Sequence, residues 1–239
     1  MKTTIVIPTF NEAENLPKLI QTVFELPVAV NLLIVDDNSP DGTGAIADQW
    51  KADYPERISV MHRQGKQGLG SAYIQGFHQA MSEGADAIGQ MDADFSHPID
   101  RIPVLMELLK TNDFVIGSRY VPGGKLDEQW PFWRKGLSSF GNFYARTILG
   151  MQIRDVTGGF RLWKKETLAA MPLERVKSNG YIFQVEMAYL ATRLGFHCAE
   201  TPIYFADRRW GQSKMSFRIQ LEAAYRTWLL IGLYRDLRG

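Results

Sequence analysis

The chain has 239 residues, of which 45% are apolar and 22% are charged, a composition typical of a globular protein of one large domain or two small ones. The single cysteine, Cys198, excludes an internal disulfide framework and fits a reducing compartment. The longest apolar stretch, residues 228–234, is far too short to span a bilayer, and the first residues lack the features of a secretory signal. We therefore expect a soluble or peripheral protein in the cytoplasm.

Charge is divided unevenly along the chain. Residues 1–118 contain 8 Lys and Arg against 16 Asp and Glu, whereas residues 119–239 contain 19 against 10. An acidic half suits metal ligands and a basic half suits phosphates. Two oppositely charged faces that attract each other would give the same division, so both interpretations stay open.

In the first half of the chain, short β-branched runs alternate with amphipathic segments. Strands are predicted at residues 3–7, 32–35, 58–61, 87–91 and 114–116. Helices are predicted at residues 14–24, 42–53, 71–82 and 99–109. This alternation predicts βαβ units, and therefore an α/β fold with a mostly parallel central sheet flanked by helices.

The second half is less regular. A loop rich in glycine, proline and tryptophan is predicted at residues 120–135. Helices at 137–149 and 183–193, a strand-like segment at 198–205 and a final helix from about residue 217 follow it.

Two aspartates separated by one residue come directly after the strand predicted at 87–91. Asp92 and Asp94 can aim their carboxylates at one Mg²⁺ or Mn²⁺, because these ions prefer oxygen ligands and are often held by one or two carboxylates and substrate phosphates. Alternatively, Asp94 is the N-cap of a helix that begins near residue 97. The position after a strand favours the metal, since ligands of open α/β sheets bind at the carboxyl ends of strands.

The first two predicted strands also end in polar residues. Asp36 and Asp37 follow the second strand, where carboxylates can accept hydrogen bonds from a base or a ribose hydroxyl. After the first strand, Phe10 can flank a planar base and Glu12 can reach its edge, while Asn11 can cap the next helix. The glycines that follow the third strand lack both the Walker and the dinucleotide spacing, and they are weak evidence of a phosphate loop.

Four cations of the basic half are candidate phosphate ligands. Arg119 follows a predicted strand, Arg134 lies in the long loop, and Arg208 and Lys214 lie in a segment with glycine and serine. Arginine suits bidentate phosphate recognition and lysine supplies a point charge. Most such residues are solvated surface charges, but the loop position of Arg208 and Lys214 favours a functional role.

Runs that match one known family occur in family order over nearly the whole chain. They are residues 8–12, 35–43, 66 with 68–70, 91–98, 117–120, 158–161, 180–186 and 207–214. These runs resemble those of the inverting family 2 glycosyltransferases with the GT-A fold, and within that family those of the dolichyl-phosphate and polyprenyl-phosphate mannose synthases. The resemblance implies one GT-A catalytic domain over residues 1–239, with a nucleotide-binding half (1–118) and an acceptor-side half (119–239) that ends in an amphipathic helix.

The resemblance also implies roles for individual residues. The positions that would surround the nucleotide are Pro8, Phe10, Glu12, Val35 and Asp37. Those at the diphosphate and the metal, Mg²⁺ or Mn²⁺, are Asp92, Ala93 and Asp94, with Asp92 and Asp94 as the ligands. The cations that would bind phosphate are Arg119, Arg208 and Lys214, and the catalytic residues would be Asp94 and Arg119. Arg134 stays a further candidate for substrate binding from the basic half of the chain. The chain departs from the family pattern at Phe10, where tyrosine is common, and at Ser96, where some members have a glutamine that helps to hold the metal.

The implied reaction is inverting transfer of a hexose, expected to be mannose from GDP-mannose, to dolichyl or polyprenyl monophosphate. A donor of the UDP-glucose type, a non-lipid acceptor and a non-catalytic nucleotide-sugar-binding module stay open as alternatives. The partners expected are the nucleotide-sugar and the lipid phosphate, with no nucleic acid.

A lipid acceptor implies peripheral association with the cytoplasmic face of a membrane, and two segments are candidates. The final helix carries an apolar stripe at residues 221, 224, 225, 228 and 231, which suits an interfacial helix, although such stripes more often pack on a catalytic core. Aromatic residues near Lys135 in the long loop are the second candidate, and they are expected to contribute more. They are Trp130, Phe132 and Trp133.

Overall fold

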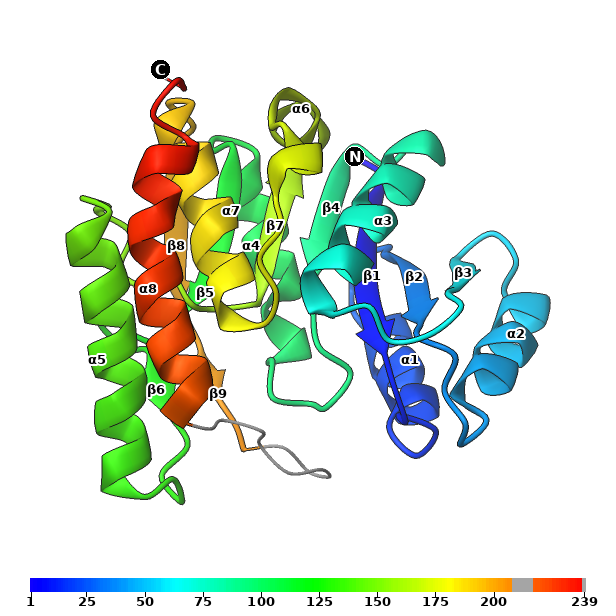
Figure 1. Ribbon diagram of the computed structural model, residues 1–239. Helices are drawn as coiled ribbons and strands as arrows, with labels where there is room; N and C mark the ends of the chain where they lie inside the picture. The colour runs from blue at the N-terminus through cyan, green and yellow to red at the C-terminus, as the bar shows by residue number, and fades with distance from the viewer. Residues whose placement is uncertain (208–216, 238–239) are drawn as a thin grey trace.

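The computed structural model describes residues 1–207 and 217–237, and a sheet of seven strands lies at its centre (Figure 1). These strands are β1 (Thr3–Thr9), β2 (Asn31–Asp36), β3 (Ile58–His62), β4 (Ala87–Gln90), β5 (Phe114–Ser118), β7 (Arg161–Lys164) and β8 (Cys198–Pro202). Their order across the sheet is β3-β2-β1-β4-β7-β5-β8. β3, β2, β1 and β4 are parallel, and β8 is parallel to β5, whereas β7 runs antiparallel between β4 and β5. The predicted α/β fold with a mostly parallel sheet is confirmed.

Helices cover both faces of this sheet. They are α1 (Leu16–Phe24), α2 (Thr43–Asp53), α3 (Leu69–Ser82), α4 (Ile102–Leu109), α5 (Phe132–Ile148), α6 (Lys165–Ala170), α7 (Tyr181–Arg193) and α8 (Phe217–Leu233), with 3₁₀ turns η1 (Ile99–Arg101) and η2 (Leu173–Arg175). A separate parallel pair is formed by β6 (Lys125–Leu126) and β9 (Tyr204–Phe205). The two chain halves do not divide the sheet, because β7 from the second half lies between two strands of the first.

The core consists of two clusters, one on each face, because side chains alternate along a strand. In β1, Val6 joins the cluster under α3 and α7, whereas Ile5 and Ile7 join the cluster under α1 and α4. A β-carbon on Gly76 of α3 would lie 2.4 Å from a methyl carbon of Val6. Glycine at this position therefore lets α3 approach the sheet closely.

Every element predicted in the first half is present, with boundaries that move by up to two residues, except that the last predicted helix is divided into η1 and α4. The second half needs corrections. Residues 132–135, predicted as loop, form the first turn of α5, and residues 198–205 form two strands, β8 and β9. Neither β7 nor α6 was predicted: β7 begins and ends in a charged residue and lacks the apolar run that marks β4, and α6 has only six residues.

The final helix does not bury the stripe that the sequence predicted. α8 lies beside α5 (Figure 1), and its Trp228 indole donates a hydrogen bond of 2.8 Å to the hydroxyl oxygen of Tyr144. In the described part of this segment, Thr227 and Leu230 of α8 are buried, as is Tyr234 directly after it, whereas Tyr225 is 66% exposed and belongs to the predicted stripe. Packing of the stripe on the core is therefore wrong for Tyr225, Trp228 and Ile231, which are exposed, because the buried positions 227, 230 and 234 also have helical spacing. The side chain of Leu221 lies outside the described part of the chain. Among the described residues, no helix is both long and apolar enough to cross a membrane.

Candidate active site

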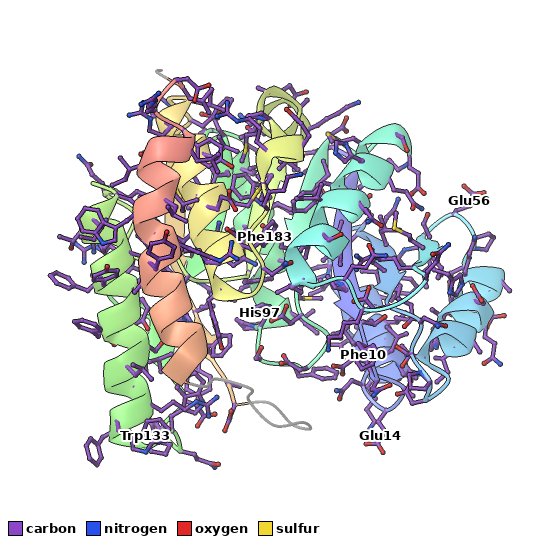
Figure 2. The ribbon with its side chains drawn as sticks, in the orientation of Figure 1. Phe10, Glu14, Glu56, His97, Trp133 and Phe183 are labelled. Carbon is purple, nitrogen blue, oxygen red and sulfur yellow. The ribbon has the colours of Figure 1, made fainter. Side chains whose placement is uncertain are left out.

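The predicted nucleotide and metal residues gather where β1, β2 and β4 end, at the lower edge of the sheet in Figure 1. Figure 2 shows Phe10 and His97 at this edge, from the loops that follow β1 and β4. Three non-glycine residues among those described have a positive φ, Asn11 (62°), Asn38 (57°) and Phe95 (61°), and one follows each of these strands. Positive φ is unfavourable for a residue with a side chain, above all for a bulky one, and such backbone strain concentrates at functional loops.

At the end of β2, Asp37 is buried against Arg63, the residue that directly follows β3. The Arg63 guanidinium donates through Nη1 to Asp37 and through Nη2 to the Ser71 hydroxyl at 2.9 Å and to Gln67 Oε1 at 3.3 Å. Asp36 has a different role, because its carboxylate accepts hydrogen bonds from the hydroxyls of Thr9 (3.0 Å) and Ser39 (2.6 Å) and fixes the turn. Of the two adjacent aspartates, Asp37 is the one whose side chain is bound by Arg63 of the loop after β3.

The loop after β1 carries Phe10 and Glu12. Lys66 lies over the Phe10 ring, with its Nζ 4.2 Å from the ring centroid, so a cation from the β3–α3 loop already covers this aromatic face. The Glu12 carboxylate accepts a hydrogen bond of 2.7 Å from the Asn15 amide. α1 begins after Asn15, so Asn11 does not cap it as predicted.

Pro8 and Val35 are neighbours in the paired strands β1 and β2. Val35 is fully buried, and its side chain belongs to the core near Gly76 of α3. The structure therefore places Val35 in the core beneath the site, and Pro8, which is half-buried, at the rim of the same strand pair.

Asp92 and Asp94 lie in the loop after β4, and each is oriented by neighbouring groups. The Tyr73 hydroxyl donates a 3.2 Å hydrogen bond to Asp92, whose backbone N–H donates to His97 Nδ1 at 3.1 Å. The Asp94 carboxylate accepts from the backbone N–H (3.0 Å) and the hydroxyl (2.6 Å) of Ser96. Asp94 is not a helix cap, since the next helical turn, η1, begins at Ile99 after Pro98.

This pair of carboxylates is suited to a hard divalent cation. Ala93 between them is buried, and the two aspartates share one short loop. The described part of the chain has no group of three or more His, Cys, Asp or Glu side chains that could hold a metal ion. Two carboxylates without a larger protein cage are the typical arrangement for Mg²⁺ that also binds substrate phosphates.

Arg119, predicted to be catalytic, is held in a buried ion pair. Its Nε and Nη2 donate to the two carboxylate oxygens of Asp155 at 2.8 and 2.7 Å, and its backbone N–H donates to the same carboxylate at 2.9 Å. Nη2 also reaches the Thr157 hydroxyl at 2.7 Å. Among the residues that the structure describes, Nε and Nη2 of Arg119 have hydrogen-bond partners and Nη1 has none, so Arg119 binds the protein first and Nη1 is the nitrogen that could reach a substrate.

Arg134 lies in the first turn of α5. It contacts Asp207 at 3.3 Å, and its guanidinium carbon lies 3.6 Å from the centroid of the Trp130 ring. Trp130 is only 8% exposed, so the prediction that it is a surface aromatic is wrong, because Arg134 and Phe205 enclose it. Arg208 and Lys214 lie outside the residues that the structure describes.

Among the residues that contact the predicted site without having been assigned to it are Arg63, Tyr73 and Asp155. The rule that identified Asp37 and Asp92, a polar residue directly after a strand, would also identify Arg63. No comparable signal marks Tyr73, which lies within a helix, or Asp155, whose partner is 36 residues away.

The same architecture occurs in solved glycosyltransferases. A mannosyltransferase, PcManGT from Pyrobaculum calidifontis in complex with GDP-Man and Mn²⁺, aligns over 99% of this chain and 67% of that chain, with a TM-score of 0.65 and 14% identity. Glucosyl-3-phosphoglycerate synthase from Mycobacterium tuberculosis, in complex with Mn²⁺, UDP and glucosyl-3-phosphoglycerate, aligns over 97% and 79%, with a TM-score of 0.63 and 16% identity. At these identities the likeness concerns the fold, which is the GT-A fold of glycosyltransferases.

Sequence comparison is more specific. Residues 4–171 match the family described as glycosyl transferase family 2, and this chain belongs to that family. The undecaprenyl-phosphate mannosyltransferase of Micrococcus luteus is 43% identical, over 100% of this chain and 98% of that protein. The polyprenol monophosphomannose synthase of Mycolicibacterium smegmatis is 42% identical, over 100% and 91%.

Proposed function

We propose that this chain transfers mannose from GDP-mannose to a polyprenyl monophosphate, with inversion at the anomeric carbon. The observation that carries the proposal is the full-length similarity to two relatives named for mannose transfer to such lipids. The site supports it, because Asp37, Phe10 and the Asp92–Asp94 pair lie along one edge of the sheet, where a nucleotide-sugar can extend from base to diphosphate.

In this proposal, Asp92 and Asp94 hold Mg²⁺ or Mn²⁺ against the diphosphate of the donor. The ion would stabilise the negative charge that develops on the departing nucleoside diphosphate. Tyr73 and His97 orient the Asp92 segment, and Ser96 orients the Asp94 carboxylate. Two solved proteins of this fold contain Mn²⁺, which supports a divalent ion without distinguishing manganese from magnesium.

The acceptor phosphate needs no general base. The second pKa of a phosphate monoester is about 6, so the attacking oxygen is already largely ionised at neutral pH. The chain must instead hold two anions together, and we propose that Nη1 of Arg119, Arg134, Arg208 and Lys214 contribute to this. Because Asp155 fixes the Arg119 side chain, Nη1 can be presented without a loss of side-chain entropy.

The proposal is tested with purified chain, a radiolabelled nucleotide-sugar and a short polyprenyl phosphate in the presence of Mn²⁺ or Mg²⁺. Mannose is expected in the lipid fraction with GDP-mannose, and not with UDP-glucose. A chelator should abolish transfer. Transfer from UDP-glucose instead would identify a glucosyltransferase, and donor binding without any turnover would identify a non-catalytic binding module.

We also propose that the outer surface of α5 and α8 contacts the membrane in which the acceptor lies. The exposed residues of this surface are aromatic or aliphatic, and they are Phe132, Trp133, Phe140, Phe143, Tyr225, Trp228, Leu229, Ile231 and Leu233. α5 contains no acidic residue. Figure 2 places Trp133 at the end of α5 that lies on the same side of the molecule as Phe10 and His97. An apolar surface with flanking cations suits a headgroup region with anionic lipid.

This surface gives a testable prediction. Serine at both Phe140 and Phe143 is expected to reduce co-sedimentation with anionic vesicles several-fold, because both side chains are more than 60% exposed and their loss removes apolar contact with lipid. Serine at Phe132 and Trp133 should have an effect of the same size. Tyr54, which is 41% exposed at the far end of α2, is the control, and Tyr54→Ser should bind normally. Unchanged binding of both double variants would contradict the assignment.

A further inference from the structure

We propose that Arg63 is a positioning residue that orients the Asp37 carboxylate toward the N–H donors of the nucleobase, and that it thereby controls recognition of the base. This inference rests on one part of the proposed function, namely that Asp37 binds the base of the donor. It concerns how the chain binds a nucleotide, and it can be tested without any transfer reaction.

The contacts of Arg63 connect three segments around Asp37. Its backbone N–H donates to the Asp36 carbonyl at 2.8 Å, which fixes Arg63 at the end of β2. Its guanidinium holds the Asp37 carboxylate through Nη1, and through Nη2 it holds Ser71 in the first turn of α3. The Asp37 backbone N–H donates to the Thr9 carbonyl at 3.0 Å. Both the backbone and the side chain of Asp37 are therefore fixed before a ligand binds.

A contribution to stability alone does not explain this arrangement. The side chains of Arg63 and Asp37 are 2% and 8% exposed, and removing two charges from water offsets much of the attraction between them. Arg63 Nε is also buried, without a hydrogen-bond partner among the described residues. A buried ion pair with an unsatisfied donor contributes little to the free energy of unfolding, because the desolvated donor is not compensated. Such a pair is explained if the Asp37 carboxylate must remain ionised and oriented for a ligand.

The charges around Asp37 support the same role. Burial raises the pKa of Asp37 above its ordinary value, and Asp36 raises it further, whereas Arg63 and Lys66 lower it. Without Arg63 the pKa of Asp37 would rise again. A protonated carboxyl loses acceptor capacity, so binding of the base should then weaken as the pH falls.

The base recognised is one with N–H donors on its pairing edge. Guanine presents N1–H and the N2 amino group side by side, and uracil presents a single N3–H. A carboxylate with one oxygen held by Arg63 retains several acceptor positions for such donors. Inorganic pyrophosphate carries the charge of the diphosphate but has no base. Its affinity for the chain should therefore not depend on Arg63.

The experiment measures binding of GDP, UDP and pyrophosphate to the full chain by calorimetry with Mn²⁺ between pH 6 and 9. Arg63→Met is expected to weaken binding of the preferred nucleotide about tenfold or more, and most at pH 6, because it removes a charged hydrogen bond from Asp37. Pyrophosphate should bind as before. The matched control is Arg57→Met at the opposite end of β3, where Arg57 donates to the Val30 carbonyl at 3.0 Å, and this variant should bind nucleotide normally.

A double-mutant cycle separates positioning from a general loss of structure. In an Asp37→Asn background, Arg63→Met should have little further effect on nucleotide binding, and Arg63→Lys, which keeps the charge, should restore part of the affinity in the native background. Equal weakening of nucleotide and pyrophosphate, or normal nucleotide binding by Arg63→Met, would overturn the proposal. If the unmodified chain binds GDP but transfers no mannose, only the proposed function fails; if it binds no nucleotide, both fail.

Discussion

Replacing Asp94 by asparagine is expected to lower kcat at least about 100-fold, which corresponds to about 2.7 kcal/mol of transition-state stabilisation. The amide removes the negative charge that would hold the cation, while its carbonyl oxygen can still accept the hydrogen bonds from Ser96. The loop should therefore keep its shape, and the loss should be confined to catalysis. Melting temperature and nucleotide-free structure should remain close to those of the unmodified chain.

The measurement is a titration of kcat against Mn²⁺ in chelator-treated buffer. Asp100→Asn is the control, because Asp100 is exposed in the same segment and is expected to have no role. Part of the loss in Asp94→Asn should be recovered at high Mn²⁺ concentration if Asp92 still contributes. Normal turnover of Asp94→Asn in metal-free buffer would show that Asp94 is not a ligand.

Asp155→Asn is expected to lower the free energy of unfolding by about 3–5 kcal/mol, since it leaves the buried Arg119 guanidinium without a counter-charge. Asp155 is fully buried and accepts three hydrogen bonds from Arg119. Urea unfolding measures the effect. Asp48→Asn is the control, because the Asp48–His62 pair is exposed and such pairs contribute about 0–1 kcal/mol.

The same ion pair makes stability depend on pH in the acid range. Burial by itself raises the pKa of Asp155, but the charge and the hydrogen bonds of Arg119 bring it below the ordinary value of 3.8. A carboxylate with a lowered pKa in the folded state stabilises the fold above its ordinary pKa, and this contribution is lost as the pH falls through the lowered value. Unfolding free energies of the unmodified chain and of Asp155→Asn should therefore converge below about pH 4.

The first half of the fold could be predicted because its strands are buried β-branched runs and its helices have one apolar side. α1, for example, buries Leu16, Leu19, Ile20 and Val23, which have the spacing of one helical face. β7 could not be predicted, since its identity depends on pairing with β4 and β5 and not on local pattern. The orientation of α8 depends likewise on its packing against α5 and α7.

Of the candidate site, the sequence located the residues at strand ends but not their partners. Asp92 and Asp94 were placed correctly after β4, since position and residue type suffice to find them. The pairing of Arg119 with Asp155 requires two loops to meet in space, and no spacing rule predicts it. Arg119 is therefore more buried than its sequence-based assignment as a phosphate ligand suggests. The roles of the two aspartates stay a prediction.

The position of β7 has a consequence for how the chain folds. During synthesis, β1 to β4 can pair as soon as they are made, but β5 must wait about 40 residues for β7, its neighbour on one side, and longer for β8 on the other. Until then β5, which is wholly buried in the finished sheet, is an unpaired apolar strand beside the open edge of β4. Contacts between residues so far apart in sequence form slowly, and unpaired edges invite aggregation. Insertion of β7 therefore pairs the open edge of β4 and one edge of β5 in a single step.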